Sequence, residues 1–308
     1  MTQTNVVMTC KHCGSNAVVR YGSYKGTQRY WCKVCKRKFK ADSTLFHMKT
    51  PANQVSSALS MYYEGMSINA IRRHLQQEYD NCPSSATIYE WIDKYTQVAI
   101  KQARQFKPKV GDTWVADETV IEVDGQNLWF WDIIDTSSRY LLASRVSFSR
   151  TTQDAQALME KASKKAGKIP KVVITDKLHA YLDGVELAFG ADTEHRQSRP
   201  FSIKDSTNII ERFHGTLKDR TKVMRGLKSI DTAIQFTDGW LVFYNYQRPH
   251  KALACKTPAQ KAGVAYPFKD WADITRLPVA TPFRSPRAKE RKMKYPEPEK
   301  LLYRETGQ

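Results

Sequence analysis

Residues 113–136, TWVADETVIEVDGQNLWFWDIIDT, predict two β-strands joined by a tight turn. The segments 113–123 and 127–136 are rich in β-branched and aromatic side chains, which fit a pleated sheet. Asp124-Gly125 lies between them and is a typical hairpin sequence, because both central positions of the commonest two-residue turn have positive φ. We therefore expect an antiparallel hairpin in this part of the chain.

The chain after this hairpin alternates between strand and helix patterns. Residues 140–148 are again β-rich, residues 151–167 are helical, and residues 171–176 form a short, strongly apolar strand. Residues 208–220, NIIERFHGTLKDR, predict a helix whose apolar side chains recur at i, i+3 and i+7, namely Ile210, Phe213 and Leu217. Three meandering strands followed by helix, strand and helix predict a mixed α/β layer.

Three acidic side chains occupy places that this layout would bring together. Asp117 lies in the first strand, Asp176 ends the apolar strand, and Glu211 projects from the helix. Glu118 is the chain neighbour of Asp117, so the two point to opposite faces and only one can face a shared site. A single acidic residue is most often solvated or in a surface salt bridge. The order of strand Asp, strand Asp and helix Glu is therefore the informative feature.

Such a group of carboxylates suits metal-dependent chemistry on phosphodiesters. Mg²⁺ prefers carboxylate oxygen, and two divalent ions about 4 Å apart can activate an attacking oxygen and stabilise the leaving one. This chemistry needs no covalent protein nucleophile. The sequence contains no G-x-S-x-G elbow, P-loop or dinucleotide-binding glycine fingerprint. Hydrolases and nucleotide-binding enzymes of those types are therefore poorly supported.

Residues 1–50 carry two Cys-x-x-Cys pairs separated by 18 residues: Cys10, Cys13, Cys32 and Cys35. This spacing matches a structural four-cysteine zinc site, and a segment of this size has too little core to fold without the metal. A redox pair is the alternative reading of each motif, and His12 is an alternative ligand. The residues between the pairs alternate and contain glycine turns, which predict a short hairpin.

Residues 51–107 predict three helices. Gly65 interrupts the first pattern, Ser67 begins the second, and Ser84 or Ser85 caps the third. Two helices joined by a short turn fit a helix-turn-helix unit, which would present residues near Thr87 and Tyr89 to a major groove. A small helical linker bundle without DNA contact is the alternative. Residues 107–112 mark the boundary to the α/β domain.

The charge of the chain points to a polyanionic partner. The 308 residues carry a formal net charge of +18, and residues 1–50 contribute ten Lys or Arg against one acidic residue, Asp42. Nucleic acid is the expected partner rather than a membrane, because no long basic amphipathic helix stands out and no stretch approaches the ~20 apolar residues of a membrane span. Without a recognisable leader, we expect a cytoplasmic, nucleoid-associated protein. Residues 266–308 predict a basic, proline-broken tail.

Several strings in the α/β region, taken in order, resemble the DDE transposase/integrase superfamily. WVADET at 114–119 resembles the motif around the first Asp, and TDKLHAY at 175–181 resembles the second. Glu211 follows Asp176 after 34 intervening residues, within a string that resembles the third motif. YNYQRPHKAL and TPAQKAG resemble the run that closes such cores. The likeness covers residues 110–265 and is greatest to bacterial insertion-sequence transposases with a zinc ribbon and helix-turn-helix ahead of the core.

The resemblance implies a multidomain fold class: a small zinc ribbon at 1–50, a helical helix-turn-helix domain at 51–107, an α/β ribonuclease-H-like catalytic core with mixed sheet at 110–265, and the tail at 266–308. In this core Asp117, Asp176 and Glu211 would bind two Mg²⁺ or Mn²⁺ ions. Lys218, seven positions after Glu211, and Lys177 would contact DNA phosphate. Asp117 is preferred over Glu118 because it occupies the Asp position of the motif.

The implied function is that of a DNA transposase. It would bind the terminal repeats of its own element, cleave a phosphodiester and transfer the freed strand to target DNA, as a homodimer or higher assembly with structural Zn²⁺ in the ribbon. A non-catalytic DNA-binding regulator, or domesticated transposase relative, is the alternative. A structure-specific nuclease is a third reading. Arg248 and His250 stay outside the predicted site, since packing roles are equally plausible for them.

Overall fold

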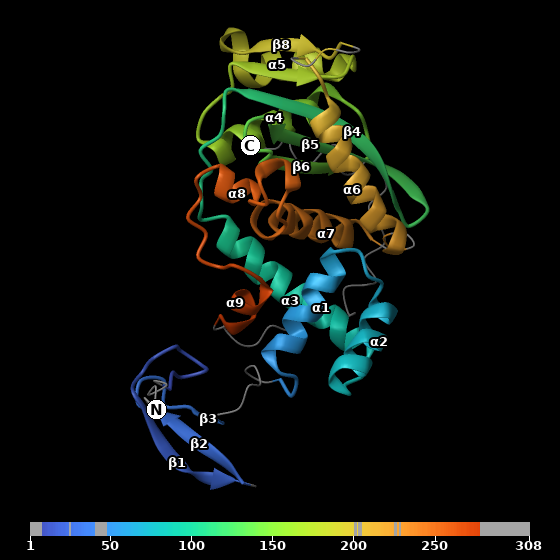
Figure 1. The fold of residues 1–308 in the computed structure, drawn as a ribbon. Coiled ribbons are helices and arrows are strands. Elements are labelled where there is room, and N and C mark those ends of the chain that lie inside the picture. The colour runs from blue at the N-terminus through green and yellow to red at the C-terminus, as the bar shows by residue number, and fades with distance from the viewer. Residues whose placement is uncertain are drawn as a thin grey trace, which may run out of the picture. The chain divides into compact units, whose positions relative to one another are not determined.

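The computed structural model describes residues 8–24, 26–40, 48–199, 202, 205–224, 227 and 229–277 (Figure 1). Within these residues the chain forms a small N-terminal sheet, three helices and then an α/β core with a five-stranded sheet. The predicted tail lies outside the described residues from 278 onward. Its described start contains helix α9 (Trp271–Arg276), in which Trp271 is buried. Among the residues described, no helix is long and apolar enough to cross a membrane.

The central sheet has the strand order β6-β5-β4-β7-β8. Its strands are β4 (Thr113–Val123), β5 (Gln126–Asp135), β6 (Leu141–Ser147), β7 (Val172–Thr175) and β8 (Glu194–Gln197). The first three pair antiparallel, whereas β4 pairs with β7, and β7 with β8, in parallel. The sheet is therefore mixed, as predicted.

The β4–β5 hairpin confirms the turn expected at Asp124-Gly125. Both residues have positive φ, at 51° and 76°. The register runs without a shift from the Val123–Gln126 pair to the Trp114–Asp135 pair. Asp117 and Asp132 are consequently direct cross-strand partners at the centre of the sheet.

Helices cover both faces of this sheet. They are α4 (Thr152–Ala166), α5 (His179–Phe189), α6 (Asn208–Met224) and α7 (Ile230–Val242), and a π-helical turn (Phe243–Gln247) follows. Helix α4 packs on α5 and against β5 and β6, whereas α6 packs on β4 and β5 (Figure 1). The predicted stripe of Ile210, Phe213 and Leu217 is buried, which fixes the rotation of α6 about its axis.

Three helices precede the core: α1 (Ala52–Tyr63), α2 (Ile68–Tyr79) and α3 (Ser85–Ala103). Ser67 caps α2, and Ser84, one of the two predicted candidates, caps α3 by accepting a hydrogen bond from the Thr87 amide. The exposed ring of Tyr89 projects from the first turns of α3. A role for this helix pair in DNA binding stays a prediction.

Aromatic packing joins the three helices to the α/β core. Tyr63 of α1 stacks on Trp271 with ring centroids 5.1 Å apart, and its hydroxyl lies 2.6 Å from that of Thr96 on α3. Gly239 of α7 leaves room for this pair, because a Cβ there would collide with both side chains. The buried guanidinium of Arg220 on α6 lies 4.0 Å from the ring centroid of Tyr62. Helix α6 is thus held by α1 as well as by the sheet.

The N-terminal sheet has the order β1-β2-β3, formed by Val18–Tyr24, Thr27–Cys32 and Lys38–Lys40. Strands β1 and β2 pair antiparallel, which confirms the predicted hairpin. Its only fully enclosed side chains among the described residues are Cys10, Cys32 and Phe39. So small a core leaves most of its stability to whatever the cysteines bind.

Candidate active site

Three carboxylates meet beside the end of β7. One oxygen from each of Asp117, Glu118 and Asp176 lies within 4.8 Å of the other two. Asp117 and Asp176 are thus brought together as predicted from the layout, and Glu118 joins them. Glu211 lies outside this close group of three.

The presence of Glu118 differs from the expectation that only one of two neighbouring residues can face the site. The side chains do leave β4 on opposite faces: Asp117 faces His214 of α6, and Glu118 approaches Tyr181 of α5. However, β7 pairs with β4 only as far as Val115. Beyond that residue β7 no longer pairs with this edge of β4, and Leu227 bridges it only at Val123, so both carboxylates can reach around the edge toward Asp176.

Asp117 is held from the α6 side by a buried histidine. His214 Nδ1 lies 3.4 Å from an oxygen of Asp117, and Nε2 lies 3.1 Å from an oxygen of Asp132. Asp132 is completely buried, and Ser144 Oγ donates a 2.6 Å hydrogen bond to its other oxygen. Burial by itself lowers the pKa of His214, but the two carboxylates together raise it to about 9. The imidazolium therefore neutralises part of the negative charge of the site.

Sequence reasoning missed His214 and Asp132. A histidine three positions after Glu211 lies on the border between the buried stripe and the polar face of the helix, where packing and function look alike. The predicted hairpin places Asp132 directly opposite Asp117. Two acidic side chains that face each other across a sheet need a cation between them, so this pairing could have indicated both Asp132 and a nearby cationic residue.

Glu118 is fixed from the opposite side. Arg150 donates a short hydrogen bond to Glu118 Oε1 and lies over the ring of Trp129, 4.3 Å from its centroid. The Glu118 side chain is only 3% exposed, and the Tyr181 hydroxyl is its neighbour on the α5 side. Burial raises the pKa of the Glu118 carboxyl and the charges of Asp176 and Asp117 add to the rise, whereas Tyr181 and Arg150 oppose it.

Glu211 and Asp176 line the same cleft of about 870 Å³. Glu211 is exposed and accepts a 2.6 Å hydrogen bond from the Thr207 hydroxyl, which precedes α6. Asp176 accepts the Leu178 amide at 2.9 Å, so the turn after β7 holds one of its oxygens. Glu211 thus lines the cleft from α6, and Asp176 is the member of the close carboxylate group that lines the cleft with it.

The predicted basic residues lie on the same side of the core. Lys177 lines the cleft beside Asp176 and is exposed. Lys218 is exposed on α6, seven residues and therefore about two turns from Glu211. Arg248 follows the π-helical turn, whereas His250 is buried against Tyr244 with ring centroids 4.6 Å apart, as a packing role requires.

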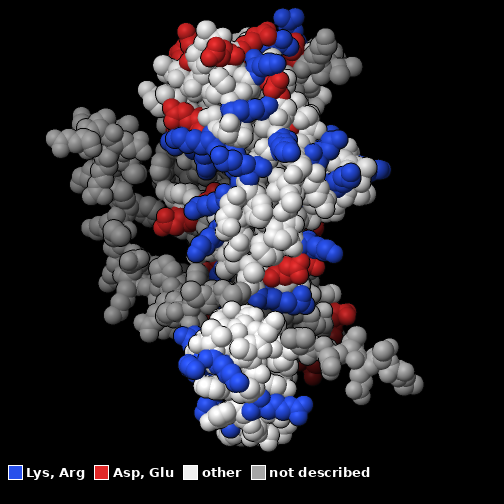
Figure 2. Space-filling view, turned by 90° about the vertical axis from the view of Figure 1, so that its left-hand side faces the viewer, with Lys and Arg blue, Asp and Glu red and all other residues white. Residues whose placement is uncertain are grey.

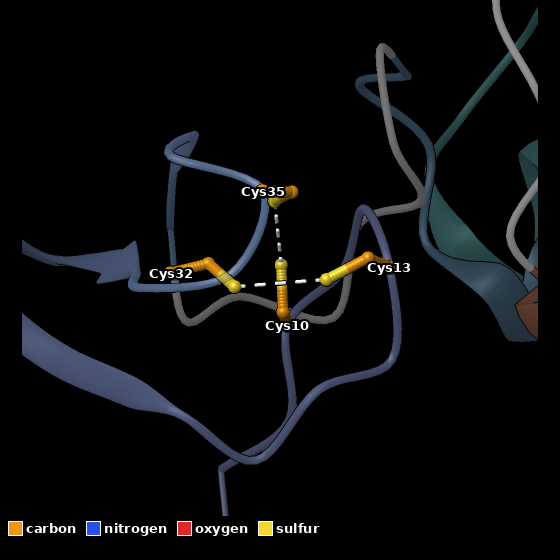
Figure 3. A group of neighbouring side chains, drawn as sticks. All are labelled: Cys10, Cys13, Cys32 and Cys35. Carbon is orange, nitrogen blue, oxygen red and sulfur yellow. Dashed lines mark hydrogen bonds between the residues drawn. The ribbon is translucent and has the colours of Figure 1, made fainter.

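The four N-terminal cysteines form a second, separate group (Figure 3). The Sγ atoms of Cys10 and Cys35 are 3.6 Å apart, as are those of Cys13 and Cys32, and all four atoms lie within 4.8 Å of one another. A tetrahedral ion with ~2.3 Å bonds to sulfur requires sulfur–sulfur distances of about 3.8 Å. The geometry therefore fits one tetrahedral metal ion.

The thiols of this group differ in pKa. The backbone amides of Cys35 and Val34 lower the pKa of Cys32 to about 6, whereas burial raises the pKa of Cys10 to about 12 although the His12 amide donates to its Sγ at 3.4 Å. The His12 ring lies instead near the Lys38 carbonyl, with Nε2 3.2 Å from its oxygen. Four cysteines thus complete the set without the histidine.

Figure 2 shows one face of the molecule, on which Lys and Arg side chains predominate over Asp and Glu along most of the surface. The excess agrees with the formal net charge of +18. A surface of this sign attracts polyanions at long range and binds them with strong salt dependence.

Parts of the chain are similar to known sequences. A family model described as a DDE domain matches residues 111–250. An uncharacterised protein in the transposable element ISH50 of Halobacterium salinarum is 33% identical over 86 residues, which are 28% of this chain and 28% of that protein. An uncharacterised protein of Methanocaldococcus jannaschii is 23% identical over 192 residues, 60% of this chain and 82% of that protein.

Two solved structures align with parts of the chain at low TM-scores. The catalytic core domain of HTLV-2 integrase, in complex with magnesium, aligns with a TM-score of 0.39 at 19% identity, over 51% of this chain and 97% of that one. The simian T-cell lymphotropic virus intasome aligns with a TM-score of 0.37 at 13% identity, over 75% and 77% of the two chains. The mixed strand order and the matched DDE-domain model agree with the ribonuclease-H-like core expected from the sequence.

Proposed function

Residues 111–250 of this chain form a DDE domain of the superfamily that contains insertion-sequence transposases, and from this premise we propose that the protein is a DNA transposase. It binds the terminal repeats of its own element, cleaves a phosphodiester at each end and joins the freed strand to target DNA. Two ends must be joined, so the working form is a dimer or a larger assembly on DNA.

The observation that carries the proposal is the meeting of Asp117, Glu118 and Asp176 beside a cleft that Glu211 also lines. The donors are all hard carboxylate oxygens, which suit Mg²⁺ or Mn²⁺. The Glu118 carboxylate is buried beside the Tyr181 hydroxyl, and one of its oxygens lies within 4.8 Å of oxygens of Asp117 and Asp176. Asp117, Asp176 and Glu211 are the proposed ligands, and Glu118 offers a further oxygen.

When bound, a pair of divalent ions supplies Lewis acidity on both sides of the reacting phosphorus. The chain positions the ligands for it. His214 fixes the Asp117 carboxylate, Arg150 fixes Glu118, and the Thr207 hydroxyl orients Glu211. Lys177 and Lys218 place positive charge where the phosphates flanking the scissile bond would lie.

Two displacements at phosphorus then account for the reaction. In the first, a water oxygen bonds to phosphorus, the bond to the 3′ oxygen of the element breaks, and that oxygen leaves as a hydroxyl. In the second, the same 3′ hydroxyl bonds to a phosphorus of target DNA and displaces the 3′ oxygen of the target strand. Neither step requires a protein nucleophile.

The N-terminal parts supply recognition in this proposal. A Zn²⁺ ion held by Cys10, Cys13, Cys32 and Cys35 stabilises a ribbon rich in Lys and Arg. Helices α2 and α3 act as a helix-turn-helix, with Tyr89 exposed on the second helix. The alternative of a DNA-binding regulator would use the same parts but would not need the carboxylate group.

A strand-transfer assay tests the proposal. Purified protein is mixed with labelled duplexes from the DNA that flanks its coding sequence and with a plasmid target, in Mg²⁺ or EDTA. Asp176→Asn and Glu211→Gln remove one charge each, and Glu186→Gln, an exposed acid on α5, is the matched control.

Joining that requires Mg²⁺, is retained by the control and is lost in both site variants would support the transposase. Cleavage without joining would leave a nuclease. Binding to the flanking DNA without either reaction, equal in all four proteins, would establish the regulator instead.

A further inference from the structure

A second cavity, of about 460 Å³, adjoins the active-site cleft. Thr136, at the end of β5, and Ile209, in the first turn of α6, line both cavities. An extended ligand that occupies the cleft can therefore pass these two residues and enter the second cavity while it stays in contact with the protein surface.

This cavity is strongly basic, and we call it the basic pocket: Arg139, Lys256 and Lys261, together with Thr136, Ile209 and Ala254. No Asp or Glu lines it. In the part of the chain that the structure describes, none of its three cations forms an ion pair, whereas Lys168 and Lys171 are both paired with Asp112. Lys256 and Lys261 are exposed, and Arg139 is half-buried.

The positive field of this region extends to the histidine behind it. Burial, followed by the charges of Arg248 and Arg139, lowers the pKa of His250 to about 4. Unpaired cations that raise the local potential in this way cost stability unless an anion neutralises them.

Both walls of the basic pocket have unusual backbone conformations. On one wall, Arg139 has φ of 58°. The buried Asp135 carboxylate stabilises the turn that contains Arg139, because it accepts hydrogen bonds from the Ser138 amide and the Gly111 amide. On the other, Ala254 has φ of 53°. Non-glycine residues in the left-handed region are uncommon and cluster at ligand sites.

We propose that the basic pocket binds the phosphodiester backbone of the DNA strand that leaves the active-site cleft past Thr136 and Ile209. The inference rests on the proposed function, because the position of the DNA strand is defined by the binding of its scissile phosphate at the carboxylate group. A phosphate chain fits better than a single small anion, since the three cations line one cavity continuous with the cleft and are presented by two separate segments, the β5–β6 turn and residues 252–261.

The test compares Lys256→Gln/Lys261→Gln with Lys164→Gln/Lys269→Gln. The control pair removes the same charge from two exposed lysines, one on α4 and one just before α9, that line neither cavity. Duplex binding is measured by fluorescence anisotropy without added Mg²⁺, which prevents cleavage and leaves the zinc in place, over a range of NaCl concentrations. Removing one lysine–phosphate interaction lowers the slope of log K against log salt by ~0.9, so the slope of the pocket variant should fall by up to about 1.8 and that of the control by much less.

Charge-neutral methylphosphonate linkages, placed one at a time around the cleavage site, locate the interaction on the DNA. We expect one or two positions on one side of the cleaved bond to weaken binding to the wild type and to have no further effect on the pocket variant. Equal slopes in the two variants, with the same methylphosphonate pattern as wild type, would overturn the inference. Millimolar inorganic phosphate could instead raise the melting temperature of wild type and the control but not of the pocket variant, while the slopes of log K for DNA against log salt stay unchanged. That result would overturn the inference in favour of a small anion.

The two proposals fail separately. If wild type cleaves and joins DNA with Mg²⁺ but the pocket variant behaves as the control, the basic pocket is refuted and the transposase stands. If the pocket variant alone loses salt dependence while wild type never cleaves, the basic pocket is supported as a DNA-binding surface and the transposase is refuted.

Discussion

His214 Nδ1 lies 3.4 Å from a carboxylate oxygen of Asp117, and this contact ties the central strand of the sheet to helix α6. The same helix carries Glu211 one turn earlier. The two acids that sequence order places nearly a hundred residues apart are therefore positioned by a single helix, one directly and one through an imidazole.

Replacement of His214 by Gln should reduce Mg²⁺-dependent cleavage by ~10–100-fold, the usual cost of losing a group that orients a metal ligand. The amide can still bond one of the two carboxylates, so the fold should survive. Cleavage rates over a series of Mg²⁺ concentrations would show a higher requirement for the ion. Unchanged rates and an unchanged Mg²⁺ requirement would mean that Asp117 needs no support from α6.

The pKa of His214, raised to about 9, makes stability pH-dependent in the metal-free protein. The unfolded chain has an ordinary histidine pKa of ~6.5, so the contribution is fully present below that pH and is lost as pH rises through about 9. A shift of this size corresponds to roughly 3 kcal/mol at most. Thermal melts in EDTA from mildly acidic to alkaline pH should show the loss in wild type and a flatter profile in His214→Gln; parallel profiles would contradict it.

Removal of zinc should unfold the N-terminal sheet and leave the α/β core folded. Cys13→Ser removes one ligand from a segment whose enclosed side chains are few, so the metal content should fall from one zinc per chain to a small fraction. Elemental analysis of the purified protein gives the stoichiometry, and near-ultraviolet circular dichroism follows the core. A Cys82→Ser control, which changes an exposed thiol outside the group, should keep its zinc.

Two glycines of the helices should respond in opposite ways to alanine. At Gly239 the added methyl meets the side chains of Tyr63 and Thr96, and overpacking of this kind costs ~1–3 kcal/mol. At Gly215 no atom lies within 4 Å of the added carbon, and alanine in an exposed helical position should stabilise by ~0.5–1 kcal/mol. Denaturant unfolding of both variants would measure the contrast; equal effects would mean that α7 does not pack closely on Tyr63.

Periodicity and turn chemistry predicted the elements that carry strong patterns. The hairpin at Asp124-Gly125, the apolar strand before Asp176 and the buried stripe of α6 were all legible in the sequence. Strand β8, with the sequence EHRQ, was not predicted, because a short polar strand at the edge of a sheet has neither alternation nor hydrophobicity. It forms because β7 offers a free edge.

The site was predictable only where residue type and order carried information. Asp117, Asp176 and Glu211 were identified as a set, but the alternation of a strand gave the wrong expectation for Glu118. Strand alternation determines the face of the sheet from which a side chain leaves the backbone. The position of the carboxylate oxygens of Glu118 also depends on where β7 stops pairing with β4 and on the length of the glutamate side chain. The basic pocket depends on contacts between residues more than a hundred positions apart, which no local pattern encodes.

Helix α6 presents Glu211 to the cleft and His214 to the sheet from adjacent turns of one rigid element. One inserted residue turns everything after it by about 100°. After an insertion between these two positions, only one of the two side chains could keep its direction. If the helix before the insertion kept its packing, His214 would turn away from the sheet; if the helix after it did, Glu211 would turn away from the cleft. Insertions and deletions should therefore be tolerated in the loop before α6 but not between Glu211 and His214. A search for related chains should require the Glu211-to-His214 spacing to be constant and allow the Asp176-to-Glu211 spacing to vary.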